Sequence, residues 1–363
     1  MSLGRYLALA AVVLLSSQTG AEGKDKESVV VTPIGQEADA ANGGVIYALP
    51  QTVVRIKLTA QVVVSTAGPF YKYSTRYMNL TNVVTANSIS WKLTGAEVMT
   101  VGVADNTRRF RIEATPAGSM PSLSLTSDGV LTAVNASAPS SVAEESQDVS
   151  PAVAYASFDH IQLPGSVQTR TSTAAMAEAC ANVIFQLRDS RIELLSGSKD
   201  ASLPDAGSYA TVLSRLDRLE ADYVSLFAGV SDTLTAVRYV DVMPDYSGAN
   251  SMVPIRFSET HGFLDALDLT GKPVYVDVEF DDAARVNAYA EGSKQRKSAP
   301  LTGLRYCIPG YLNVKVLDRN NLLTQKTVRC SQNGQTATLP AEMMLGCKIV
   351  LDPANGALVS VEK

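Results

Sequence analysis

The apolar residues of this chain change their spacing twice, and this change limits the fold more than any other feature. Residues 52–65 (TVVRIKLTAQVVVS) place branched side chains at alternating positions, which is typical of a β-strand. Between residues 173 and 227 apolar side chains recur every three or four positions, which predicts two amphipathic helices. Period-two stretches return after residue 233. The sequence predicts an α+β fold in which two β-rich regions of mainly antiparallel strands flank a long antiparallel helical hairpin.

The predicted strands lie on both sides of the helical stretch. They cover residues 45–50, 52–65, 88–103 and 109–115 before it, and 233–242, 253–257, 273–280, 310–317, 326–329, 336–339 and 347–351 after it. Asp128-Gly129 separates two apolar stretches and predicts a β-hairpin within residues 122–134. Asn333-Gly334 and Asn355-Gly356 predict further turns.

A polar, acidic segment divides the chain. Residues 136–151 contain almost no large apolar side chains and predict a linker. The predicted organisation is a signal peptide (1–21), a flexible segment (22–44), a β-rich domain (45–135), an acidic linker (136–151), a helical hairpin (152–232) and a β-rich C-terminal domain (233–363). If the hairpin packs across both sheets, the parts form one compact unit instead.

The N-terminus has the pattern of a secretory signal. Arg5 precedes the apolar run Tyr6–Leu15, and the small residues Thr19-Gly20-Ala21 offer a cleavage site. The run is about ten residues long, too short for a membrane-spanning helix, although an uncleaved anchor is the alternative. No cysteine lies near the cut. We expect an exported protein of the periplasm or outer cell surface, soluble rather than lipid-anchored, with no transmembrane segment in the mature chain.

The charge and cysteine content exclude some classes of function. The net charge of -5 gives no attraction to nucleic acid, so none is expected as a partner. An exported chain meets oxidising conditions, which allow a disulfide among Cys307, Cys330 and Cys347. The spacing contains no CxxC pair, so we expect no metal site, and no motif indicates a cofactor. Cys180 lies on the apolar face of the first predicted helix, as a small buried hydrophobe.

Aromatic residues gather after the first strand. A sugar or peptide platform could form from this set, but a core position beneath a loop is favoured because such rings bury much area. The residues are Phe70, Tyr71, Tyr73 and Tyr77, with Trp91 beyond them.

Three carboxylates share one face of a predicted strand. Asp277, Glu279 and Asp281 alternate with apolar residues, so they could bind Ca²⁺ or act as an acid–base pair. A solvated outer face is the favoured interpretation, because calcium sites usually gather their ligands from a loop. His160 and His261 have no nucleophile motif beside them. We therefore predict no catalytic residue.

Several short segments occur together in an order that resembles one protein family. They are Tyr47-Ala48-Leu49-Pro50 before a Val-rich strand, Gly68-Pro69-Phe70 followed by Tyr73 and Tyr77, Glu220 with Leu226-Phe227-Ala228-Gly229, Arg256-Phe257-Ser258, Gly271-Lys272-Pro273-Val274-Tyr275, Arg305-Tyr306-Cys307-Ile308-Pro309-Gly310 and Leu339-Pro340. Over nearly the whole mature chain, the sequence resembles exported Bacteroidota proteins of domain-of-unknown-function family 4831. Cys307 stands where the family pattern implies a basic residue. The resemblance implies export from a Bacteroidota cell and no activity, ligand or catalytic residue.

These observations favour a non-catalytic binding or assembly protein of the envelope, with an envelope protein as its partner, because long hairpins suit docking through a side face. One alternative is a periplasmic hydrolase acting on glycan or peptide, with Asp277 and Glu279 as acid and base. Another is an adhesin or fimbria-like subunit, although no donor strand is evident. The oligomeric state stays open.

Overall fold

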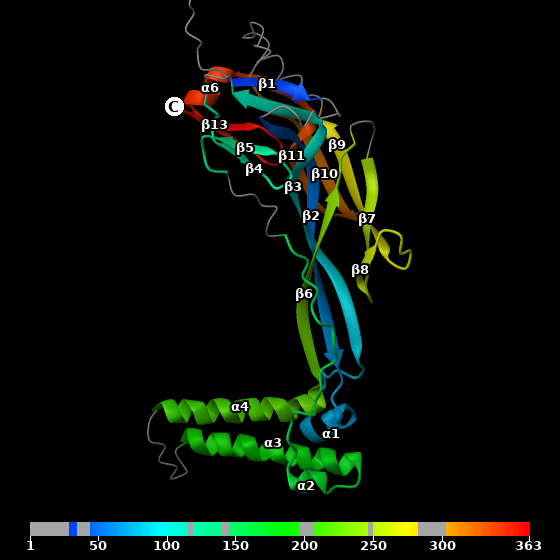
Figure 1. Ribbon diagram of the computed structural model, residues 1–363. Helices are drawn as coiled ribbons and strands as arrows, with labels where there is room; N and C mark the ends of the chain where they lie inside the picture. The colour runs from blue at the N-terminus through cyan, green and yellow to red at the C-terminus, as the bar shows by residue number, and fades with distance from the viewer. Residues whose placement is uncertain are drawn as a thin grey trace, which may run out of the picture.

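The computed structural model describes residues 29–34, 44–114, 119–138, 146–196, 206–245, 250–281 and 303–363. The predicted signal peptide lies outside the described residues. Within these ranges the strands form three sheets whose strand pairs are antiparallel, so the protein is β-rich, as predicted (Figure 1). Among the described helices, none combines the length and apolar character needed to cross a bilayer.

The first sheet, called the long sheet, has the order β1-β3-β2-β6 and forms a stalk along the molecule (Figure 1). Its strands are β1 (Val29–Ile34), β2 (Val45–Thr66), β3 (Ser88–Ala114) and β6 (Val230–Val242). β2 has 22 residues, which at 3.3 Å per residue extend about 70 Å. Even-numbered residues of β2 from Val54 to Thr66 are all buried, which confirms the alternation seen in the sequence.

Residues 45–50 and 52–65, predicted as separate strands with a break at Pro50, form the single strand β2, so this prediction is wrong. Ala48 pairs with Arg109 and Pro50 pairs with Ala104, so β3 has extra residues opposite a single residue of β2. In this bulge Asp105 accepts hydrogen bonds from the Thr107 amide (2.8 Å) and the Arg108 Nε (2.6 Å). Arg108 in turn donates to the Pro50 carbonyl at 3.0 Å. Proline lacks an N–H and is tolerated at bulges, so both strands continue past it.

The second sheet is five-stranded, with the order β11-β10-β9-β7-β8, and packs on the upper part of the long sheet. Its strands are β7 (Asn250–Ser258), β8 (Gly262–Asp265), β9 (Lys272–Asp281), β10 (Gly303–Asp318) and β11 (Asn321–Pro340). The turn predicted at Asn333-Gly334 is wrong, because both residues lie inside β11. Asn333 is buried in a bulge of β11, where residues 331–334 lie opposite Pro309 of β10, and its amide donates to the Tyr311 carbonyl at 3.0 Å.

The third sheet, called the small sheet, has the order β13-β12-β5-β4. It contains β4 (Leu123–Leu125), β5 (Leu131–Val134), β12 (Lys348–Leu351) and β13 (Leu358–Glu362), and the short helix α6 (Ala341–Gly346) packs beside it. The hairpin predicted at Asp128-Gly129 is confirmed, with Gly129 at φ +86°.

The predicted division between residues 45–135 and residues 233–363 does not separate two sheets. β6 pairs with β2 in the long sheet, and Ile349 of β12 pairs with Val134 of β5 in the small sheet. Each of these sheets thus joins strands from both predicted domains, and the pairing is long-range, so local periodicity does not reveal it.

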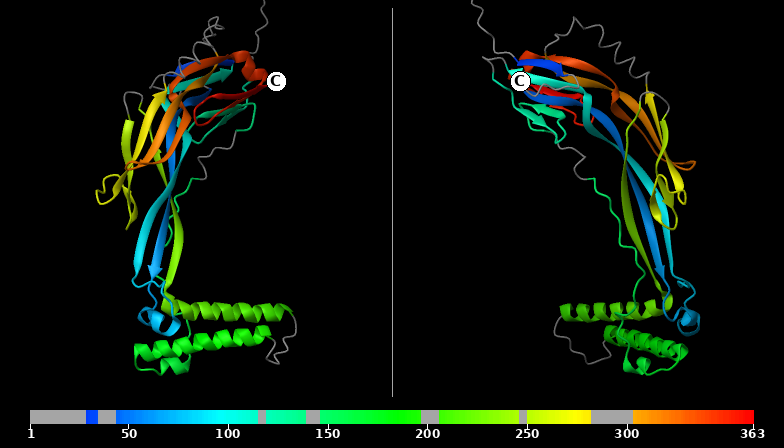
Figure 2. Two further views of the ribbon diagram at one scale, coloured as in Figure 1. Left: turned by 180° about the vertical axis from the view of Figure 1, so that it is seen from behind. Right: turned by 45° about the vertical axis from the view of Figure 1, so that its right-hand side comes forward.

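Helices gather at the end of the stalk that lies away from the small sheet (Figures 1 and 2). They are the 3-10 helix η1 (Tyr71–Tyr73), α1 (Ser74–Met78), α2 (Gly165–Gln168), α3 (Thr173–Ser196) and α4 (Ala206–Ala228). The last two, called the helical arm, follow the two predicted apolar stripes and run crosswise to the stalk. A core that includes Phe70, Ile184 and Phe227 holds the arm to the stalk.

The last part of the predicted linker, residues 146–151, lies along a sheet edge with the residues that follow it. Val149 and Val237 of β6 exchange two backbone hydrogen bonds of 2.9 Å. Farther along, the Ala156 amide donates to the Thr66 hydroxyl at 2.9 Å. This segment, called the strap (residues 146–157), runs beside β6 towards the helices and shields an edge that could otherwise pair with another chain (Figure 2).

Candidate functional site

The structure divides the predicted aromatic cluster. Phe70 is buried against Phe227, with ring centroids 5.5 Å apart, and Tyr73 and Tyr77 pack beside the same core at 6.1 Å from one another. Tyr71 is half-buried on η1 beneath the Lys72 ammonium group. These rings support the base of the helical arm, whereas Trp91 lies apart from them on β3.

The three carboxylates lie on the outer face of β9. Val274, Val276 and Val278 point into the core, so the residues between them face outward. Asp277 accepts a hydrogen bond from the Ser251 hydroxyl at 2.6 Å, and Glu279 is exposed opposite Asn313. Asp281 ends the strand opposite Tyr311. Within the described ranges no three His, Cys, Asp or Glu residues form a group that could hold a metal ion.

The four cysteines are buried free thiols in this structure, so the disulfide allowed by the sequence is not formed. Cys330 packs between the long and five-stranded sheets, whereas Cys347 belongs to the core beside the small sheet. The Cys307 thiol donates to the Ser331 carbonyl at 3.9 Å. Burial raises the pKa of Cys307 to about 11, more than the nearby Arg108 lowers it, and burial alone raises the pKa of Cys180 to about 11.

We expect the native protein to react very slowly with a thiol reagent at mildly alkaline pH. Only the thiolate reacts, and burial both blocks access and raises the pKa of Cys180 and Cys307. Labelling should therefore accelerate when pH rises toward those pKa values or when the protein is denatured. Reagent counting without reductant should find almost no reactive thiol before denaturation and four thiols after it. A count of two in the denatured, unreduced protein would instead indicate a disulfide.

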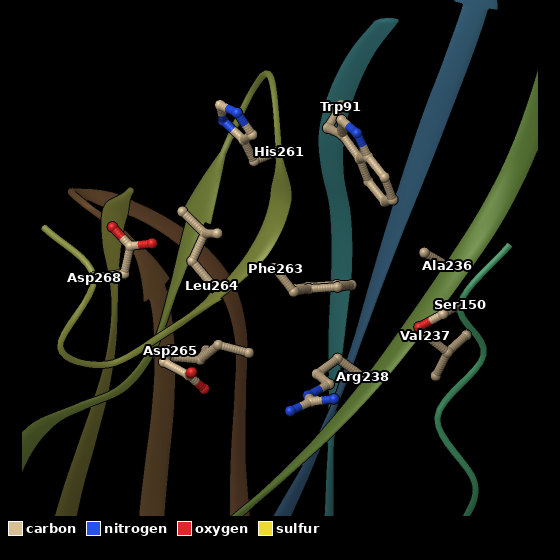
Figure 3. Close-up of a pocket in the computed structure, with 11 residues that line it drawn as sticks. Trp91, Ser150, Ala236, Val237, Arg238, His261, Phe263, Leu264, Asp265 and Asp268 are labelled. Carbon is tan, nitrogen blue, oxygen red and sulfur yellow. The ribbon is translucent and has the colours of Figure 1, made fainter. Parts of the chain in front are cut away.

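A cavity of about 380 Å³ lies where the long sheet and the five-stranded sheet diverge (Figure 3). β3 and β6 form one wall, the hairpin of β7 and β8 forms the other, and Ser150 of the strap closes one side. This volume is within the range of small-ligand pockets, about 300–1,000 Å³. It is lined by Trp91, Ser150, Ala236, Val237, Arg238, Ile255, His261, Phe263, Leu264, Asp265 and Asp268.

The apolar part of the cavity is built around Trp91. Its backbone N–H donates to the Glu259 carbonyl at 2.8 Å, which ties β3 to the hairpin. Gly262 has φ +76°, and a Cβ atom there would lie 2.8 Å from Cε3 of the indole. Only glycine therefore lets the hairpin approach the ring so closely. Phe263 lines the cavity from β8 and stacks edge-on against Phe257 at 5.5 Å.

The polar groups come from both walls. Arg238 Nη1 donates to Asp148 of the strap at 2.7 Å, and His261 Nδ1 lies 2.8 Å from the Thr260 hydroxyl. Asp268 Oδ1 accepts hydrogen bonds from the Thr270 hydroxyl (2.6 Å) and amide (3.0 Å). The bond from the Thr270 hydroxyl is the main reason that the pKa of Asp268 is lowered. Figure 3 shows Asp265 and Arg238 on opposite sides of the lower end of the cavity.

Sequence reasoning named Trp91 and His261 but did not place them together. The cavity joins segments near residues 91, 150, 237 and 260, which no local motif connects. Alternation along β6 could have shown that Arg238 shares the inward face with Ala236 and Val242. The charge of Arg238 on an otherwise apolar strand face was the sequence signal that could have indicated this site.

The model of one protein family, described as Domain of unknown function (DUF4831), matches residues 43–359. No curated protein and no solved structure matches the chain.

Proposed function

The chain belongs to the DUF4831 family, and from this premise we propose that it is an exported, non-catalytic binding or assembly protein of the cell envelope. One observation carries the proposal. The helical arm extends crosswise from the stalk (Figure 2), and large apolar side chains are exposed on its outer half. Export rests on the signal pattern of residues 5–21.

We infer that α3 and α4 act as one antiparallel helical hairpin. Arg188 pairs with Glu220 at 2.7 Å and Arg191 pairs with Asp217 at 3.1 Å, so residue numbers rise on one helix as they fall on the other. The Tyr209 hydroxyl donates to the Leu194 carbonyl at 2.6 Å, farther toward the tip. These contacts hold the two helices in register as a single docking element.

The outer part of this hairpin, called the arm tip (residues 185–196 and 207–222), has no buried residue. Four of its large apolar side chains are exposed: Phe185 is 43% exposed, Ile192 63%, Leu195 59% and Leu219 46%. Helices of this length depend on tertiary packing more than on intrinsic propensity. An exposed apolar stripe on such an element is typical of a surface that docks on a partner protein.

A photo-crosslinking amino acid at Ile192 or Leu195 of the full chain is expected to capture one discrete envelope protein in living cells. The same amino acid at Glu279, which is exposed on the five-stranded sheet, is the matched control and should capture nothing. With the photo-crosslinking amino acid at Leu195, an Ile192→Ser substitution should reduce the captured product about tenfold. The free energy of unfolding of this variant should change by only about 0.5 kcal/mol, because the site is exposed. Equal products from all three positions, or none from the arm, would contradict the proposal.

A further inference from the structure

We propose that the cavity beside Trp91 binds a short neutral saccharide. This inference goes beyond the proposed function, because the cavity lies between two sheets and shares no residue with the arm tip. Three features support it: a fixed aromatic ring, polar groups with unused hydrogen-bonding capacity, and the balance of charge.

The aromatic ring is held in place before any ligand binds. Trp91 is half-buried, Gly262 lies against its six-membered ring, and its own backbone is tied to Glu259. Because the indole is already held in one orientation, little conformational entropy is lost when a ligand binds to its apolar surface. The C–H face of a sugar ring can pack on such a surface, and Phe263 extends it from the opposite wall (Figure 3).

The polar groups provide both acceptors and donors. The Asp265 carboxylate has no hydrogen-bond or ion-pair partner among the residues that the structure describes, and Asp268 uses only Oδ1. Among the described residues Arg238 has one side-chain partner, which its Nη1 contacts, so its other nitrogens remain available to a ligand. A sugar hydroxyl can donate to a carboxylate and accept from a guanidinium at once, so it suits this mixture.

The charge balance argues against an anionic ligand. Asp148 compensates Arg238, so the carboxylates of Asp265 and Asp268 leave the rim net negative. This charge disfavours phosphates and acidic sugars. A cationic ligand could pair with the same carboxylates, so cationic probes are included in the test.

The only tryptophan of the chain lies at this site, so its fluorescence reports on the cavity alone. Titration of the full mature chain with neutral oligosaccharides of glucose, galactose, mannose and N-acetylglucosamine is expected to shift the emission of Trp91 with at least one of them. Calorimetry should then give the same dissociation constant. Asp265→Asn should weaken binding about tenfold, and because this side chain is exposed and unpaired, the variant should unfold like the wild type.

Glu279→Gln is the matched control, since it removes an exposed carboxylate from the same sheet on its outer face and should leave affinity unchanged. Three results would overturn the proposal. They are no response to any of these saccharides, an equal effect of both variants, or a response to tetramethylammonium or a lysine-rich peptide instead. Loss of arm crosslinks would not affect these measurements, so failure of the proposed function is recognised separately.

Discussion

Gly68→Ala is expected to destabilise the protein by about 3 kcal/mol, the upper end of the usual cost of overpacking. A Cβ atom at this position would lie 2.3 Å from the Leu226 carbonyl oxygen and 2.7 Å from that of Ser225. Both are backbone atoms of α4, so no side-chain rotation relieves the clash. The same Leu226 carbonyl accepts the Phe70 N–H at 2.9 Å, and a shift of α4 would break that bond.

The effect should be greatest where the helical arm joins the stalk. Urea unfolding followed by circular dichroism should show the lower stability, and limited proteolysis should cut the arm faster than in the wild type. Gly95→Ala is the control, because a Cβ atom on that β3 residue would meet nothing within 4 Å. It should change stability by only about 0.5 kcal/mol. If the two variants unfold alike, the close contact between stalk and arm is refuted.

Thr52→Val is expected to cost about 3 kcal/mol, because the buried Ser331 N–H and the half-buried Ala354 carbonyl lose their partner, at about 1–3 kcal/mol for a buried group. The Thr52 side chain is fully buried. Its hydroxyl accepts the Ser331 N–H at 3.0 Å and donates to the Ala354 carbonyl at 2.9 Å. Valine keeps the shape but supplies neither interaction.

This hydroxyl links β2 to β11 and to the loop before β13. The substitution should therefore weaken the packing of all three sheets on one another. Chemical unfolding monitored by Trp91 fluorescence should show a lower midpoint with an unchanged slope. Thr235→Val is the matched control, an exposed threonine on β6, and should be neutral within about 0.5 kcal/mol. A stability loss at Thr235 equal to that at Thr52 would show that the buried network contributes nothing.

Local periodicity predicted the elements that depend on neighbouring residues. The alternation from Val54 to Thr66 appears as β2, the two apolar stripes appear as α3 and α4, and Asp128-Gly129 makes its hairpin. The same local signals gave wrong breaks at Pro50 and at Asn333-Gly334. In both places a bulge against the neighbouring strand accommodates the residue, and only pairing reveals it.

The candidate site also shows how little local sequence patterns reveal about contacts between distant segments. Trp91 and His261 were noticeable as single residues, yet Arg238 and Asp265 become relevant only when the two sheets diverge around them. Asp277 and Glu279 looked like a pair because they alternate, and the structure places both on an outer face.

The sequence by itself determined the β-rich character, the positions of the two long helices and the family of the chain, because periodicity and short ordered motifs are local properties. The tertiary structure alone decided that strands before and after the helices share the long sheet and the small sheet. It also decided that four distant segments enclose one cavity and that the arm stands clear of the stalk. The physical reason is that strand pairing and sheet packing join residues hundreds of positions apart, such as Thr52 and Ser331, through contacts that no window of sequence contains.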